Sequence, residues 1–147
     1  MTLDLESDFI SKIDCKFPYN DREACLSLIN EAAALSTNSM FMVIHEICRV
    51  PSSAKDKVNT DFLIGLLEET KTKFNHPLKD MVLDTAINVV NGHDLTVDEA
   101  MLRMVRVKYY KGQYNALSIM YFSCDDKEDR LEPLWDKIIS EWNNNAT

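Results

Sequence analysis

The sequence predicts an all-α fold, a single domain over residues 1–147 with about seven or eight helices. Along most of the chain, apolar residues recur at the three- and four-residue spacing of amphipathic helices. Capping residues and prolines separate these stripes at intervals of one helix length. The 147 residues include only three glycines, which leaves few positions for tight β-hairpin turns. We therefore expect successive αα-hairpins, arranged as a HEAT-like repeat or as an irregular helical bundle.

The first elements expected are a short N-terminal helix and a hairpin over about residues 21–49. Leu5, Phe9, Ile10 and Ile13 share one face of the N-terminal helix. The hairpin begins near Asn20, which has Glu23 three residues later, the spacing of a capping box. Two apolar stripes then follow, formed by Cys25, Leu28, Ile29, Ala32 and Leu35 and by Met40, Phe41, Ile44, Ile47 and Cys48.

A second hairpin is expected over about residues 54–91. Its first helix begins near Ser53 and places Val58, Phe62, Leu66, Thr70 and Phe74 on one face. Pro77 suits the first turn of the second helix, where the missing N–H has no intrahelical partner to lose. That helix carries the most regular stripe of the chain, formed by Leu78, Met81, Val82, Thr85, Ala86, Val89 and Val90. Gly92 stands where a C-terminal cap belongs.

The third hairpin is expected over about residues 96–123, and a closing helix over about 131–142. Thr96 and Glu99 have the spacing of a capping box, and Gly112 separates the two helices of the hairpin. The residues expected to face inward in the first of these helices are Ala100, Met101, Met104 and Val105. The closing helix has Pro133 near its start and an apolar stripe formed by Leu134, Trp135, Ile138, Ile139 and Trp142.

Cysteine spacing and hydropathy predict a cytoplasmic protein with no membrane association. The four cysteines (Cys15, Cys25, Cys48 and Cys124) match no common zinc or disulfide spacing. The first eight residues contain three acids, the wrong chemistry for a secretory signal. The longest uncharged stretch is too short and too polar to span a bilayer.

The formal net charge of -8 argues against direct nucleic-acid binding, which requires a cationic face. One local exception is the segment 100–124, which contains Arg103, Arg106, Lys108 and Lys111 and no acid. Tyrosines and a phenylalanine lie among these cations, a composition that also suits single-stranded nucleic acid. However, cations toward the C-terminus of a helix are favoured by the helix dipole alone, and Lys108 points away from the two arginines. We expect no direct nucleic-acid partner.

His93-Asp94 resembles the metal-binding dipeptide of helical HD-type phosphohydrolases. Such a site also needs an earlier histidine, His45 or His76, and a later aspartate. The aspartates available are Asp125, Asp126 and Asp136. Yet the dipeptide follows Gly92, in an expected loop, whereas in those enzymes it lies within a helix. We therefore predict no catalytic, cofactor-binding or metal-binding residues, and keep the phosphohydrolase as an alternative.

Two acidic surfaces are candidates for partner binding. Asp80, Asp84 and Asn88 follow one another at four-residue spacing, opposite the apolar stripe of their helix. The second group, near the C-terminus, consists of Asp125, Asp126, Glu128 and Asp129. Such faces are often ordinary solvated surface, but complementary charge also speeds the encounter with a basic protein.

A small, helical, acidic chain with hairpins and reduced cysteines resembles the immunity proteins of bacterial contact-dependent growth inhibition and related polymorphic-toxin systems. The resemblance implies a non-catalytic protein that binds a cognate basic toxin domain, often a nuclease, and blocks its active site. If the second helices of the hairpins line one surface, as in curved repeats, Glu46 joins Asp80, Asp84 and Asn88 there. Tyr110 and Tyr114 are possible aromatic anchors.

A second alternative is a helical adaptor that binds a partner peptide or helix. Its groove would be formed by methionines, which are over-represented at adaptable binding surfaces. The candidates are Met40, Met42, Met101, Met104 and Met120. Methionine is also a common core residue, so the exposure of these side chains separates the two possibilities.

Overall fold

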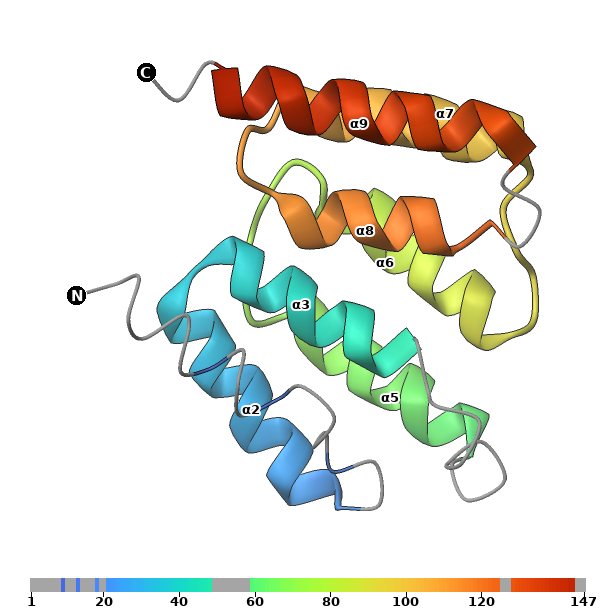
Figure 1. Ribbon diagram of the computed structural model, residues 1–147. Coiled ribbons are helices and arrows are strands. Elements are labelled where there is room, and N and C mark those ends of the chain that lie inside the picture. The colour runs from blue at the N-terminus through green and yellow to red at the C-terminus, as the bar shows by residue number, and fades with distance from the viewer. Residues whose placement is uncertain are drawn as a thin grey trace.

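The computed structural model describes Phe9, Ile13, Pro18 and residues 21–48, 59–124 and 128–144. These residues form α-helices and contain no strand, which confirms the all-α prediction (Figure 1). The helices are α2 (Arg22–Leu35), α3 (Thr37–Cys48), α5 (Thr60–Lys71), α6 (Lys79–Val90), α7 (Val97–Lys108), α8 (Tyr114–Phe122) and α9 (Glu128–Asn144).

Consecutive helices pair as α2 with α3, α5 with α6 and α7 with α8. Ser36 alone separates α2 from α3, while residues 72–78 join α5 to α6 and residues 109–113 join α7 to α8. Gly92 directly follows the C-cap of α6 and Gly112 lies in the connection between α7 and α8; their φ values of 85° and 90° are a left-handed backbone that glycine adopts without a Cβ penalty. Phe9 and Ile13 are helical and buried, whereas the predicted start near Ser53 lies outside the described residues.

The helix N-termini show one predicted cap and two differences. Thr96 and Glu99 form the expected capping box, with each side chain accepting from the other residue's backbone N–H. The N-cap of α2 is Asp21, whose carboxylate accepts from the Ala24 N–H at 3.1 Å; Asn20 lies outside the described residues. Pro77 precedes α6 instead of occupying its first turn, because the helix begins two residues later.

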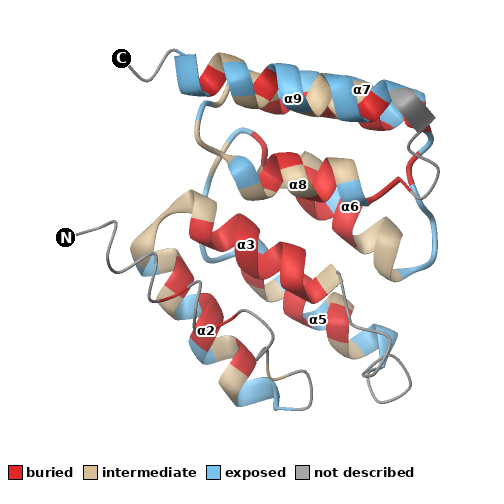
Figure 2. Ribbon diagram, in the orientation of Figure 1, coloured by how far each residue is buried: buried red, intermediate tan, exposed pale blue. Residues whose placement is uncertain are grey.

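Helix α3 is the central element of the fold. Its residues 39–47 are all buried, so the rest of the protein covers this part of the helix on every side (Figure 2). It packs against α2, α5, α6 and α8. In a curved repeat each hairpin contacts only its neighbours in sequence, yet here the first hairpin packs directly on the third. The arrangement is therefore an irregular bundle and not a HEAT-like repeat.

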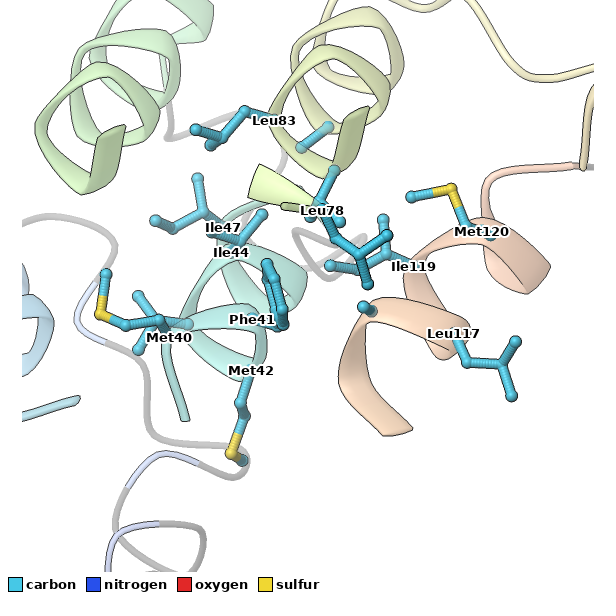
Figure 3. Close-up of a cluster of buried hydrophobic side chains, with 14 of the residues drawn as sticks. Met40, Phe41, Met42, Ile44, Ile47, Leu78, Leu83, Leu117, Ile119 and Met120 are labelled. Carbon is cyan, nitrogen blue, oxygen red and sulfur yellow. The ribbon is translucent and has the colours of Figure 1, made fainter. Parts of the chain in front are cut away.

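Side chains from α3, the start of α6 and α8 meet in the core (Figure 3). Phe41, Leu78 and Leu117 are among its largest fully buried members. Four of the five methionines proposed for an adaptor groove are also buried, namely Met40, Met42, Met104 and Met120. The prediction of a methionine groove is therefore wrong, because these side chains fill space between helices.

A polar contact ties α3 to α8 across the sequence. Asn38 and Asn115 are 77 residues apart, and the Asn38 Oδ1 accepts from both the backbone N–H and the Nδ2 of Asn115 at 3.2 Å. The Asn115 Nδ2 also donates to the Asn38 carbonyl, and Gln113 Nε2 donates to Thr37 Oγ1. Asn38 therefore satisfies an N-terminal N–H of α8, whose own N-cap residue, Gln113, makes no side-chain cap bond.

Helix α9 closes the bundle against α7. Leu131, Ile138 and Trp142 are buried, and the Trp142 indole N–H donates to the Lys108 carbonyl, at the last residue of α7, at 2.9 Å. Lys108 Nζ lies 3.1 Å from the Glu141 carboxylate. The helix begins at Glu128, three residues before the predicted start, so that Pro133 falls inside it. Within the described residues, no helix has the length and apolar character needed to cross a membrane.

Cys25, Cys48 and Cys124 are free thiols. Cys25 is fully buried and donates its S–H to the Pro18 carbonyl at 3.0 Å. Burial, with a smaller contribution from the nearby charge of Asp21, raises the pKa of this thiol to about 11. Cys25 is therefore a protonated core residue, as its position in an apolar stripe predicts.

Candidate partner-binding groove

A groove of about 780 Å³ lies between α5, α6 and α7. Three acids and three bases line it together with apolar side chains. The acids are Glu68, Asp80 and Asp84; the bases are Lys71, Arg103 and Arg106; the apolar residues are Leu67, Pro77, Met81, Leu83 and Ile87. The sequence assigned the acidic row of α6 and the basic segment of α7 to separate candidate sites, whereas the fold brings them together.

The α6 wall of the groove carries the predicted acidic row. Val82, Thr85 and Ala86 face the core, which directs Asp80 and Asp84 toward solvent, one helical turn apart. The Asp84 side chain is 67% exposed. Asp80 stands in the first turn of α6, where the helix dipole favours a negative charge.

The opposite wall is formed by Arg103 and Arg106 of α7. Arg103 is 22% exposed at its side chain, and its guanidinium lies 3.9 Å from the Asp84 carboxylate. It also donates a hydrogen bond to Thr85 Oγ1, and that hydroxyl in turn donates to the Met81 carbonyl. Arg103 is thus held by two neighbouring residues of α6, while Arg106 extends toward solvent at the groove's edge.

Two residues predicted to share this acidic surface lie elsewhere. Glu46 is only 8% exposed, so its placement on the surface is wrong. Its helix, α3, is the second helix of the first hairpin, but it lies inside the bundle instead of on a common face with α6. Asn88 is half-buried on α6 and is not among the residues that line the groove.

The described residues include only part of the C-terminal acidic group. Asp125 and Asp126 lie outside them. Glu128 and Asp129 are the first two residues of α9.

The outward face of α7 exposes three large apolar side chains, of which the sequence placed Val105 inside. Leu102 is 69% exposed, Val105 39% and Tyr109 78%. The prediction that Val105 faces inward is wrong, because the buried stripe follows Val97, Ala100, Met104 and Val107. This register repeats at three, four and three residues, and it turns residues 102, 105 and 109 to solvent. We call Leu102, Val105 and Tyr109 the α7 strip.

The two predicted aromatic anchors are engaged within the protein. The Tyr110 ring packs on the His76 ring with centroids 5.1 Å apart, and the Tyr114 ring packs on Trp142 at the same distance. Among the tyrosines that the structure describes, the most accessible is Tyr109, at 78%, which the sequence did not single out as an anchor. The signal that points to it is its seven-residue spacing from Leu102, on the face opposite the buried stripe.

The basic segment does not form a continuous cationic stripe. Arg103 faces Asp84 of α6, and Lys108 faces Glu141 of α9. Two of the four cations are thus paired with acids from different helices on different sides of α7. The fold therefore directs Arg103 and Lys108 to different neighbours and does not align them in one row.

The histidines are dispersed over the fold. His93 and Asp94 are exposed in the loop after α6, whereas His45 is buried on α3 with its Nε2 3.4 Å from Ser118 Oγ. In the part of the chain that the structure describes, no three His, Cys, Asp or Glu side chains are grouped to hold a metal. Two of the three aspartates considered for the phosphohydrolase alternative, Asp125 and Asp126, lie outside the described residues.

His76 has a structural position at the start of α6. Its Nδ1 accepts from the Leu78 N–H at 3.0 Å, and its ring makes edge contacts with Phe41 and Tyr110. Burial lowers the pKa of this imidazole from its ordinary value. A neutral ring is required for the hydrogen bond, because a protonated Nδ1 has no lone pair to accept.

Comparison of the chain with family models, with curated proteins and with solved structures gave no match.

Proposed function

We propose that the protein is a non-catalytic binding protein that neutralises a cognate toxin domain in the cytoplasm. The observation that carries this proposal is the exposed acidic wall formed by Asp80 and Asp84 at the rim of the groove. The chain's net charge of -8 gives the whole molecule a field that attracts a basic protein. A nuclease domain has such a basic surface, because its active site must attract phosphate.

In this mechanism the inhibitor acts by steric cover and by charge. Asp84 keeps 67% of its side chain exposed although Arg103 lies beside it, so a second cation can approach the carboxylate from solvent. Asp80, one turn away, offers a second carboxylate to the same partner surface. Carboxylates that pair with the toxin's phosphate-binding cations would compete directly with its substrate.

The groove also offers an apolar contact between its charged walls. Met81 and Ile87 are half-buried there, so part of their surface can be removed from water when a partner binds. Binding energy in protein interfaces concentrates in such central, desolvated contacts, with charges around them. We therefore place the centre of the interface over the groove and not over the C-terminal acidic group.

The helical adaptor remains the second candidate, and the mixed charge of the groove favours it. Acids line one wall and arginines the other, an arrangement that fits a peptide or helix carrying charges of both signs. The two candidates differ in the partner they require. A toxin partner is a folded basic domain, whereas an adaptor partner is a segment that retains affinity as an isolated peptide.

The test is to co-express the chain with the product of the adjacent gene and to purify the complex at low and moderate salt. The double variant Asp80→Asn/Asp84→Asn is compared with Glu132→Gln/Asp136→Asn, which removes the same charge from the exposed side of α9. We expect the groove variant to bind at least about tenfold more weakly and to lose protection from toxicity, and the control to retain both. Equal behaviour of the two variants, or a neighbour that is neither toxic nor bound, contradicts the proposal.

A further inference from the structure

The outward face of α7 concentrates exposed apolar surface. Five large apolar side chains are exposed in the described residues, and three of them form the α7 strip. Leu102, Val105 and Tyr109 follow one another at three and four residues, so they lie side by side along about two helical turns. Exposed apolar groups that gather in one place mark interaction surfaces more often than single exposed residues do.

Charged residues of opposite sign flank Leu102 along the helix. Glu99 precedes Leu102 by three residues and Arg106 follows it by four, so all three share one face. The Glu99 and Arg106 side chains are both exposed. Glu99 is fixed by the capping box, in which it accepts from the Thr96 N–H at 3.0 Å. A rigid carboxylate thus stands at one end of the face, Leu102 lies in the middle, and a guanidinium stands at the other end.

This order is complementary to itself when the helix is reversed. In an antiparallel pair of α7 helices with a two-fold axis beside Leu102, the position of Glu99 lies opposite that of Arg106 in the other copy. The same pairing recurs on the other side of the axis, because a two-fold interface uses one patch twice. The Leu102 side chains then meet at the axis, and each Tyr109 covers the first turn of the other α7.

We propose that two copies of this chain associate through α7, by antiparallel pairing of the two helices about Leu102 with reciprocal Glu99–Arg106 contacts. One helix face provides an interface at the low end of the specific range, below about 1,200 Å² in total. The dimer is therefore weak and depends on concentration. This proposal does not rest on the toxin-binding function and is tested on the chain alone, although Arg106 also lines the groove.

Sedimentation equilibrium of the full chain from about 10 μM to about 1 mM measures the association. Leu102→Glu places a charge on the axis, where we expect dimerisation at least about tenfold weaker than in the wild type. The matched control is Ala34→Glu, at an exposed position of α2 away from the strip, which leaves dimerisation unchanged. Circular dichroism verifies that both variants are folded.

Charge reversal then identifies the orientation of the pair. Arg106→Glu and Glu99→Arg each place like charges opposite one another in their own homodimers, so each variant alone is expected to remain monomeric. An equimolar mixture restores both opposite-charge pairs, and a heterodimer of near wild-type strength is expected. A chain that stays monomeric to about 1 mM overturns the proposal. A dimer insensitive to Leu102→Glu, or a mixture that does not associate, also overturns it.

Discussion

The carboxylate of Asp84 and the guanidinium of Arg103 lie 3.9 Å apart across the groove between α6 and α7. Arg103 has a second contact, because it donates to the hydroxyl of Thr85, the next residue of α6. The arginine is largely covered, while Asp84 is 67% exposed at its side chain. The two contacts therefore differ in strength: the hydroxyl bond lies in a partly buried place, and the ion pair is open to water and to salt.

This difference predicts unequal effects on stability. Arg103→Met keeps most of the side-chain volume but removes both contacts, and we expect the free energy of unfolding to fall by about 1–2 kcal/mol. Asp84→Asn removes only the exposed ion pair, for which we expect a loss below about 1 kcal/mol. Urea unfolding at low and moderate salt measures both values. If Asp84→Asn costs as much as Arg103→Met, the ion pair and not the Thr85 contact holds the arginine.

The reciprocal contact of Asn38 and Asn115 supplies a second prediction. Asn38→Ala removes the Oδ1 that accepts from the Asn115 N–H and Nδ2, while the bond from Nδ2 to the carbonyl of residue 38 remains, and we expect a loss of about 1–2 kcal/mol. Asn38→Asp keeps an acceptor oxygen and places a carboxylate at the N-terminus of α8, so it should remain close to wild type.

Asn30→Ala, at an exposed position of α2, is the control for this substitution and should change the unfolding free energy by less than about 0.5 kcal/mol. All three variants are compared by urea unfolding. A loss in Asn38→Asp as large as that in Asn38→Ala would show that an acceptor oxygen at position 38 does not account for the stabilisation.

The sequence predicts the helices well because their signals are local. The Thr96–Glu99 capping box, the glycines that end helices and the stripe spacing all depend on residues within a few positions of one another. The packing order of the hairpins is not local. It depends on contacts such as Asn38 with Asn115, 77 residues apart, which no periodicity reveals. A curved repeat and a bundle therefore remained equally compatible with the pattern.

The candidate site was predictable only in part for the same reason. Asp80 and Asp84 are exposed as their position opposite an apolar stripe requires. Glu46 occupies an equivalent place in its hairpin, but α3 is covered from several sides, so its polar residues are buried with the rest. The sequence identifies Arg103 as one of the cations of the segment 100–124. Its position beside Asp84 depends on where α7 lies relative to α6, which the sequence pattern does not reveal.

A third prediction concerns pH. Burial holds the pKa of His76 below its ordinary value of 6.5, so the fold favours the neutral ring. The stabilisation from this residue is fully present above about pH 6.5 and is lost as the pH falls through the lowered value. Urea unfolding of the wild type between about pH 7.5 and pH 5 should show this decline, together with the contribution of the carboxylates.

The variant His76→Asn separates the histidine from the carboxylates. An asparagine side chain can accept from the N–H two residues later, which replaces the bond to Leu78 without a titrating group. We expect this variant to be less stable at neutral pH, because it lacks the ring contacts with Phe41 and Tyr110, but to lose less stability on acidification. The control is His93→Asn, at an exposed loop position. If the unfolding free energy depends on pH equally in the wild type and in both variants, His76 is not the source of that dependence.

The closing helix depends on Trp142, which fills a buried site and donates to the last carbonyl of α7. Trp142→Phe keeps most of the buried ring and removes the indole N–H, so we expect a loss of about 1 kcal/mol. Trp142→Ala also opens a cavity beside Tyr114 and should cost about 3–5 kcal/mol. Trp135→Ala, at a half-buried position of the same helix, should cost less than Trp142→Ala. Urea unfolding followed by circular dichroism distinguishes the three; equal losses in Trp142→Phe and Trp142→Ala would assign the stabilisation to the hydrogen bond instead of to packing.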